Sequence, residues 1–417
     1  MSGKRIVKNT GIIFLSIFLI SIIFSLFFLY FSIPSEIILP EHTQLSINSI
    51  PIGSFETDAD DDSIPSINTN YNTIKIKSGA VGEYGYDYKL FNSIPIKQVS
   101  VTVIPKNYVI PSGKTYGVKM YTDGLLVVSV SSVTGKDFNV YYPAKDAGIC
   151  EGDRILSVDG IKLNTNEELA KYVNEKKEKI RLEIAREDEI ITTDITPVMS
   201  NDNDSYKIGI WVRDSTAGIG TMTYYNPEDG SFGALGHAIT DTDTGDILTV
   251  SKGSLIDCSI LSIKKGKSGT PGELTGGFSG GSVATIIENN DFGIYGFLIN
   301  DKKIPDNEPV EIATRFQVKQ GDAYILSDVD GEGVRKYSVE IVKISQSAAL
   351  DNKGIIIKVT DPELLEKTGG IVQGLSGSPL VQNGKLIGAV THVFVNDPTR
   401  GYGIFIENML AEAEKIK

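Results

Sequence analysis

Residues 370–380 read GIVQGLSGSPL, and the interpretation of the whole chain depends on this stretch. Ser376 stands in a Gly-x-Ser-Gly-x-Pro pattern, with β-branched residues on both sides. Gly374 allows a sharp backbone turn, so the N–H groups of Gly374 and Ser376 can converge on one point as an oxyanion hole. We expect Gly377 to let a substrate backbone approach closely. The pattern makes Ser376 a candidate nucleophile, and the alternative is a glycine-rich turn with incidental serines.

The residues after this stretch predict a β-hairpin. Residues 380–392 are rich in aliphatic and β-branched side chains, and Asn383 and Gly384 interrupt them. An Asn-Gly pair is typical of a two-residue hairpin turn. The sequence therefore predicts that the loop of Ser376 is held on a rigid sheet.

A nucleophilic serine needs a base, and histidine has the pKa that suits this task. The chain has three histidines, His42, His237 and His392. His237 lies among small residues in the stretch GALGHAIT, far enough before Ser376 for two consecutive small β-barrels with a cleft between them. We assign His42 to a linker and interpret His392, in the strand after the Ser376 loop, as a structural or pocket-wall residue.

The acid that would orient His237 cannot be chosen from sequence spacing, because a triad is defined by geometry. Asp241, Asp243 and Asp246 follow His237 closely, but their sequence is typical of a polar turn. Asp361 is followed by Pro-Glu-Leu-Leu, so it is also a predicted helix N-cap. Both possibilities stay open on the residues alone.

From about Ile208 to the C-terminus, the chain resembles the sporulation stage IV protein B family of serine peptidases. The resemblance rests on four blocks, residues 213–223, 232–237, 369–379 and 388–399. It implies a chymotrypsin-like fold with two barrels.

The resemblance also implies roles for individual residues. Ser376 would be the nucleophile, His237 the base and Asp361 the acid. It favours Ser376 over Ser378, in agreement with the glycine pattern. No cofactor is expected, since the sequence has neither a Cys/His cluster typical of a metal site nor a phosphate-binding loop.

A second module is indicated by residues 147–160, which read AGICEGDRILSVDG and resemble a PDZ domain. Thr165 and Glu168 form a capping box, which predicts a helix from Asn166 to about Lys177 with Leu169 and Val173 on its inner face.

The resemblance to a PDZ domain implies a peptide groove between this helix and the strand that begins at Gly117. Such a groove takes an extended peptide as an added strand and binds its terminal carboxylate with backbone N–H groups. The predicted peptide-binding residues are Gly117, Val118, Lys119, Leu169 and Val173. The alternative is a purely architectural small barrel.

The N-terminus predicts a membrane anchor. Residues 11–32 carry no charge and are long enough to span a bilayer. Lys4, Arg5 and Lys8 precede them without any acidic residue, which predicts a cytoplasmic N-terminus and an exported remainder. A cleavable signal peptide is the alternative.

The expected fold is mostly β, with a cytoplasmic N-terminus and transmembrane signal anchor in residues 1–32. A flexible stalk with short strands (33–100), a PDZ-like domain (101–200) and a two-barrel serine protease domain (205–417) follow. The formal net charge of −13 argues against nucleic acid as a partner.

The resemblance implies a membrane-anchored, exported serine endopeptidase that acts between the two membranes around a forming endospore. It would cleave a membrane-bound regulatory protein and thereby signal sigma-factor activation. Expected partners are that substrate, a peptide at the PDZ groove, and other copies of the chain, cut in trans within the stalk. The alternatives are a non-catalytic PDZ-based signalling protein and a general quality-control protease of the cell envelope.

Overall fold

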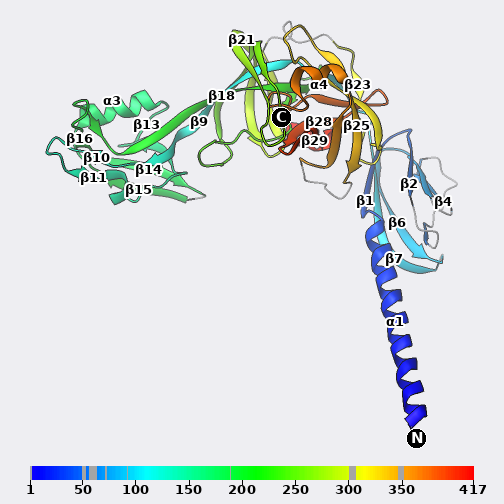
Figure 1. The fold of residues 1–417 in the computed structure, drawn as a ribbon. Helices are drawn as coiled ribbons and strands as arrows, with labels where there is room; N and C mark the ends of the chain where they lie inside the picture. The colour runs from blue at the N-terminus through cyan, green and yellow to red at the C-terminus, as the bar shows by residue number, and fades with distance from the viewer. Residues whose placement is uncertain are drawn as a thin grey trace. The chain divides into compact units, whose positions relative to one another are not determined.

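A computed structural model describes residues 2–48, 53–55, 63–70, 73–91, 93–187, 189–299, 307–345 and 352–417 (Figure 1). The chain divides into two compact units. The first comprises Met1–Asn107 with Ile312–Lys319, and the second comprises Tyr108–Glu311 with Gln320–Lys417.

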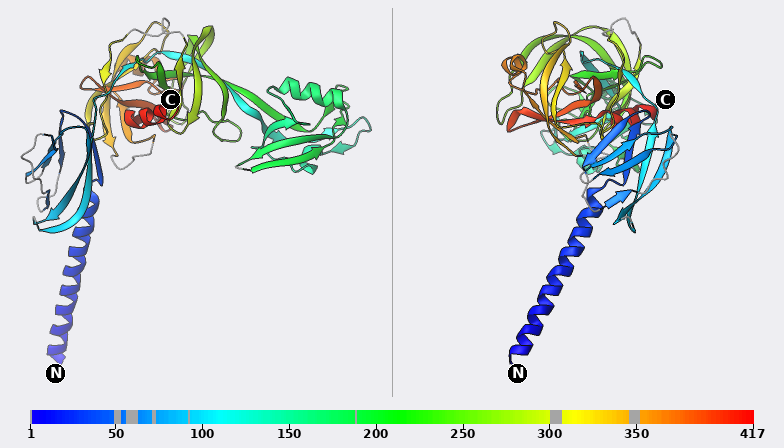
Figure 2. Two further views of the ribbon diagram at one scale, coloured as in Figure 1. Left: turned by 180° about the vertical axis from the view of Figure 1, so that it is seen from behind. Right: turned by 90° about the vertical axis from the view of Figure 1, so that its right-hand side faces the viewer.

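The first unit begins with helix α1 (Ser2–Ser32), which runs directly into strands (Figure 2). One sheet has the order β1-β7-β6-β3 and another has the order β2-β5-β4. The strands are β1 (Glu36–Pro40), β2 (Gln44–Asn48), β3 (Gly53–Phe55), β4 (Ser66–Asn70), β5 (Thr73–Lys77), β6 (Gly82–Leu90) and β7 (Ile94–Ile104).

This unit has a hydrophobic core of its own, in the region where the sequence predicts a flexible stalk with short strands. Alternate residues of the strands are buried, such as Ile37 and Leu39 in β1 and Val99, Val101 and Val103 in β7. Because side chains alternate between the faces of a strand, even short segments with this pattern can cover one face of a sheet.

The predicted transmembrane helix is wrong. Among the residues that the structure describes, no helix is both long enough and apolar enough to cross a membrane.

The second unit contains a first barrel. Its strands pair in the order β9-β20-β21-β22-β19-β18, and the pairing of β18 with β9 closes the ring. The strands are β9 (Thr115–Val130), β18 (Ile210–Tyr225), β19 (Ser231–Ala234), β20 (Val250–Lys264), β21 (Glu273–Asn290) and β22 (Gly293–Leu298). Two edge strands, β8 (Tyr108–Pro111) and β23 (Val310–Glu311), extend this sheet beside β18.

A second, closed barrel has the order β24-β25-β26-β29-β28-β27. Its strands are β24 (Gly321–Ser327), β25 (Arg335–Ile344), β26 (Ile355–Val359), β27 (Pro379–Gln382), β28 (Lys385–Phe394) and β29 (Asp397–Phe405). Helix α4 (Pro362–Thr368) follows β26, and α5 (Ile406–Glu414) follows β29. Asn383 and Gly384 have φ values of 52° and 77°, which confirms the predicted hairpin turn between β27 and β28.

A PDZ-type module lies in the chain between β9 and β18. Its sheet has the order β15-β14-β12-β9, and the last residues of β9 pair with the first residues of β18. The new elements include α2 (Pro143–Asp146), β12 (Arg154–Val158), α3 (Asn166–Lys176), β14 (Ile180–Arg186) and β15 (Glu189–Ile195). Three short pairings complete the module. Strand β10 (Val133–Thr134) pairs with β11 (Val140–Tyr141), and β16 (Val198–Met199) pairs with β17 (Tyr206–Lys207). Strand β13 (Ile161–Lys162) pairs with β12.

The predicted helix of this module is confirmed, together with its N-terminal cap. Thr165 Oγ1 accepts a hydrogen bond from Glu168 N at 3.2 Å, and Leu169 and Val173 are buried. Strands β9 and β18 run side by side through both the barrel and the module (Figure 1). Each therefore has one end in the barrel and the other in the PDZ-type module.

Candidate active site

A pocket of about 620 Å³ is lined by both barrels. From the first barrel come residues of β18, β21 and the segment after β19. From the second come the segment before β27 and residues 391–393, near the end of β28. His237, Gly374, Ser376 and His392 all line this pocket, so the structure brings the predicted nucleophile and the predicted base together.

The loop of Ser376 is held by two threonines of β18. Thr221 Oγ1 donates to the carbonyl of Gly374 at 2.7 Å, and Thr221 N donates to the carbonyl of Ser376 at 3.0 Å. Thr223 Oγ1 donates to the carbonyl of Gly377 at 2.8 Å. These bonds turn three carbonyls of the loop toward β18 and fix the path of its backbone.

Some backbone N–H groups of the same loop donate hydrogen bonds, and others have no acceptor within the described residues. Those of Leu375, Gly377 and Ser378 donate to carbonyls within the second barrel. Within the described residues, those of Gly374 and Ser376 have no acceptor. An oxyanion hole requires available donors beside the nucleophile, so these two N–H groups are its candidates.

The two glycines of the loop adopt conformations that other residues rarely adopt, with φ of 103° at Gly374 and 93° at Gly377. A Cβ on Gly377 would lie 2.0 Å from the carbonyl oxygen of Thr221. The close approach at Gly377 is therefore made by β18, and not by a substrate as the sequence suggested.

Ser376 and Ser378 have different surroundings. Ser376 lines the pocket, and its Oγ donates to the carbonyl of Thr391 at 2.7 Å. Ser378 is fully buried, and its Oγ lies 3.3 Å from Ser327 Oγ. Access to the pocket therefore distinguishes the two serines.

His237 follows β19 through Leu235 and Gly236, which have φ values of 68° and 72°. Its Nδ1 lies 2.7 Å from the carbonyl of Ala238, and its ring centroid lies 4.8 Å from that of His392. Burial lowers the pKa of His237, and the hydrogen bond to Ala238 opposes this shift only in part. A neutral ring whose Nδ1–H donates to a carbonyl leaves Nε2 as a proton acceptor.

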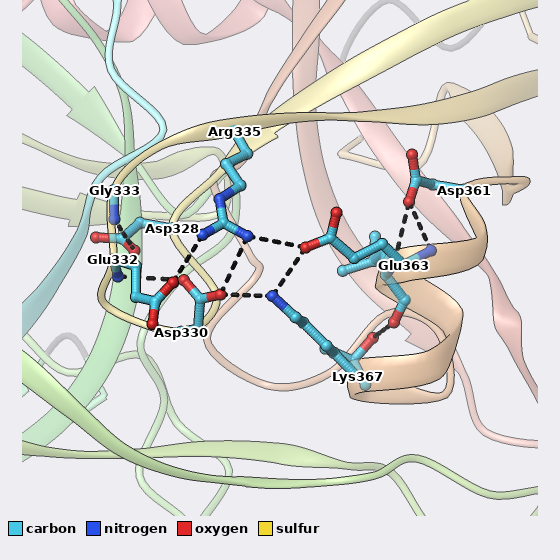
Figure 3. A network of polar contacts seen from close by, with 10 residues as sticks. Asp328, Asp330, Glu332, Gly333, Arg335, Asp361, Glu363 and Lys367 are labelled. Atoms are coloured by element: carbon cyan, nitrogen blue, oxygen red, sulfur yellow. Dashed lines mark hydrogen bonds and ion pairs between the residues drawn. The ribbon is translucent and has the colours of Figure 1, made fainter.

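Asp361 is not part of this pocket. It is the N-cap of α4, and its Oδ1 accepts from the N–H groups of Glu363 at 3.0 Å and Leu364 at 3.1 Å. Its Oδ2 accepts from Ser338 N at 3.2 Å. Figure 3 shows it at the start of α4, beside an ion-pair network that includes Arg335. Within the described residues, neither Asp361 nor an aspartate after His237 is hydrogen-bonded to the imidazole.

The five predicted peptide-binding residues are not brought together. Leu169 and Val173 are buried in the core of the PDZ-type module. Gly117, Val118 and Lys119 lie in the barrel part of β9, where β18 pairs on one edge and β20 on the other. No edge of β9 is left there for a peptide to join, and Val118 lines the active-site pocket instead.

Sequence reasoning missed Thr221, Thr223 and Arg213. The two threonines stand two residues apart in β18, so they face the same side of the strand. Two hydroxyl side chains on the same face of a predicted strand were the available signal for a polar partner. Arg213 lies in the same strand and pairs with Asp241 and Asp243, two of the candidate acids.

Residues 204–410 match the family model of the SpoIVB peptidase S55, and residues 140–186 match that of a PDZ domain. No curated protein matches the chain. Among solved structures, the PDZ domain of the SdrC-like protein (Lmo2051) from Listeria monocytogenes is 26% identical over 22% of this chain and 87% of that chain, with a TM-score of 0.18.

Two further structures are of the protease Rv3671c. An inactive form is 15% identical over 48% of this chain and 84% of that chain, with a TM-score of 0.26. An inactive serine-to-alanine mutant from M. tuberculosis H37Rv is 14% identical over 48% of this chain and 83% of that chain, with a TM-score of 0.25.

Proposed function

Because the chain belongs to the SpoIVB peptidase S55 family and carries a PDZ domain, we propose that its serine peptidase activity is endopeptidase cleavage by Ser376 with His237 as the base. The positions of the two side chains support Ser376 as the nucleophile and His237 as the base. Both side chains line a single pocket, and the N–H groups of Gly374 and Ser376 beside it have no acceptor within the described residues.

In the proposed reaction, the Ser376 hydroxyl leaves the carbonyl of Thr391 and turns toward His237. Its Oγ attacks the peptide carbonyl while His237 Nε2 takes the proton. The oxyanion receives hydrogen bonds from the two available N–H groups. The imidazolium then donates its proton to the leaving amine, and a water molecule hydrolyses the acyl-enzyme in the same way.

We propose that the carbonyl of Ala238, rather than Asp361, orients His237 in this reaction. The family resemblance implies Asp361 as the acid. Three backbone N–H groups already donate to its carboxylate at the start of α4, and His237 Nδ1 is bonded to Ala238. These contacts support a structural role for Asp361.

We further propose that the substrate is a membrane-bound regulatory protein and that the cut signals sigma-factor activation during endospore formation. The site of action would be the space between the two forespore membranes. Family membership supports this proposal. Self-cleavage between residues 33 and 100 is part of it, and would require a connection between strands of the first unit to extend into the pocket of another copy.

A fluorophosphonate probe on the purified chain tests the proposed chemistry. We expect covalent labelling of the wild type and none of Ser376→Ala. Absence of labelling in the folded wild type would favour a non-catalytic PDZ protein. A tagged Ser376→Ala chain mixed with active enzyme tests self-cleavage, and a tagged chain that stays intact while the active chain processes itself excludes cutting in trans.

Fluorophosphonate labelling tests the chemistry only, so the developmental role needs a separate experiment. We expect the protein to be made only during endospore formation, and a deletion to block activation of the late sigma factor. Expression throughout growth, with sigma-factor activation unaffected by the deletion, would favour a general quality-control protease of the envelope.

A further inference from the structure

The segment from Ala238 to Thr249 leads from His237 into β20, and it decides where the imidazole lies. His237 Nδ1 is hydrogen-bonded to the carbonyl of Ala238, the first peptide of this segment. A shift of the segment would therefore carry the ring with it. We call residues 238–249 the histidine segment.

Arg213 of β18 forms ion pairs with two aspartates of the histidine segment. Its Nη1 is paired with Asp241 Oδ2, and its Nη2 lies 2.5 Å from Asp243 Oδ2. The side chain of Asp241 is 0% exposed, and its Oδ1 accepts from the N–H groups of Asp243 and Thr244. A buried carboxylate needs such partners, because burial without them is costly.

Asn289 of β21 holds the same segment from the other side. Its Oδ1 accepts from Ile239 N, and its Nδ2 donates to the carbonyls of Ile239 and Leu248, each at 2.8 Å. The segment is thus held by two buried or half-buried side chains, one on β18 and one on β21.

The end of β18 that carries Arg213 belongs to the PDZ-type module. Ile210 and Val212 pack against the core of that module. Asp214, next to Arg213, accepts at Oδ2 from the N–H of Asn166, the first residue of α3, at 3.0 Å. The strand that holds the histidine segment is therefore also bonded to the helix of the module.

A second link ties the far end of the histidine segment to the module. Arg154 of β12 donates from Nη1 to Thr249 Oγ1 at 2.9 Å and to the carbonyl of Asp123 at 3.1 Å. The histidine segment is therefore bonded to residues of the module at Asp241 and Asp243, through Arg213, and at its far end, through Arg154.

We propose that Arg213 is a positioning residue for His237, and that through it the PDZ-type module controls the geometry of the active site. The proposal rests on His237 being the base of the proposed function. Arg213 does not line the pocket, so it acts only through the histidine segment. A ligand that moves the start of β18 or of α3 would change the position of the imidazole.

The variants Arg213→Met and Arg213→Lys test the positioning role. A displacement of about 1 Å in a base lowers turnover by about 100-fold. We expect this loss in kcat for Arg213→Met with KM little changed. Arg213→Lys keeps the charge but can pair with only one of the two aspartates at a time, so it should recover part of the lost kcat. The matched control is Arg335→Met, since Arg335 also pairs with several carboxylates (Figure 3), none of which belongs to the histidine segment. It should keep its kcat.

A readout that is independent of activity separates this proposal from the proposed function. Burial lowers the pKa of His237, so a loosened segment that admits water should raise it. We expect the His237 imidazole resonance of Arg213→Met to titrate at higher pH than in the wild type. Wild-type enzyme without any peptidase activity would refute the proposed function and would leave this titration measurable.

Arg213→Met leaves Asp241 buried without its cation, so the single variant could unfold. The double variant Arg213→Met with Asp241→Asn removes both charges and guards against this. We expect it to fold, to lose kcat, and to show the raised His237 titration. A double variant with wild-type kcat and wild-type titration would mean that Arg213 only neutralises Asp241, and would overturn the proposal.

The variant Asn166→Pro tests the coupling to the module. Proline suits the first position of a helix and removes the N–H that Asp214 accepts, while Thr165 already has the extended backbone that precedes proline. We expect the His237 titration to move in the same direction as in Arg213→Met, by less. The emission of Trp211, the single tryptophan of the chain, should shift with it. An unchanged titration in folded Asn166→Pro would overturn the coupling.

Discussion

The loop of Ser376 and the turn at Asp361 both follow a strand or helix of the second barrel, and both were singled out in the sequence for catalysis. In the loop, the glycine pattern and the candidate role agree, because Ser376 lines the pocket beside two available N–H groups. In the turn, the local pattern allowed a helix cap and a triad acid, and the structure contains the cap. A local pattern predicts what a side chain does for its own backbone better than what it does across a barrel.

The largest expected effect belongs to the loop. Ser376→Ala should lower kcat by about 10⁶-fold, because the nucleophile is lost. Ser378→Ala should keep measurable fluorophosphonate labelling, since Ser378 is buried beside Ser327 and does not line the pocket. Loss of labelling in Ser378→Ala with retention in Ser376→Ala would reverse the comparison between these serines.

The next effect tests how the loop is held. Thr221→Val keeps the shape of the side chain and removes the hydroxyl that donates to the Gly374 carbonyl. A misplaced oxyanion donor costs about 10²-fold in kcat, and we expect a loss of this order. Steady-state kinetics on a peptide substrate would measure it. A Thr221→Ser variant retains the hydroxyl and serves as the control, and equal losses in both variants would argue against this role.

The pH dependence tests the buried imidazole. The pKa of His237 is lowered in the folded state, so between this value and about 6.5 the unfolded state binds more protons. The contribution of His237 to stability should be complete above about pH 6.5 and should fall as the pH drops toward the folded pKa. Urea unfolding between pH 5 and 8 would measure this, and His237→Gln should weaken the dependence. An equal slope in both proteins would contradict a buried neutral imidazole.

The smallest effect belongs to Asp361. Asparagine also caps helices, so Asp361→Asn should keep both stability and turnover, whereas Asp361→Ala should lose about 1 kcal/mol of unfolding free energy. Thermal unfolding and kcat on the same samples would show it. A drop of about 10⁴-fold in kcat for Asp361→Asn would restore the triad implied by the family resemblance.

The features that the sequence predicted well are those made by residues close together in the chain. The capping box at Thr165, the Asn383-Gly384 turn and the φ > 0 glycines around Ser376 follow from the steric and hydrogen-bonding limits of a few residues. The mostly-β composition follows from the same local preferences.

The sequence by itself determined that Ser376 stands on a tight turn and that a PDZ-type module and a peptidase share the chain. Only the tertiary structure decided which residues from other parts of the chain contact these elements. Residues 117–119 joined the barrel because β9 is a single strand of both modules, and an alternating pattern is the same in either sheet. The hydrogen bond of Thr221 to the Ser376 loop and the ion pair of Arg213 with Asp241 depend on strand pairings between residues far apart in sequence. Such pairings depend on how whole sheets close, and no short stretch of residues specifies them.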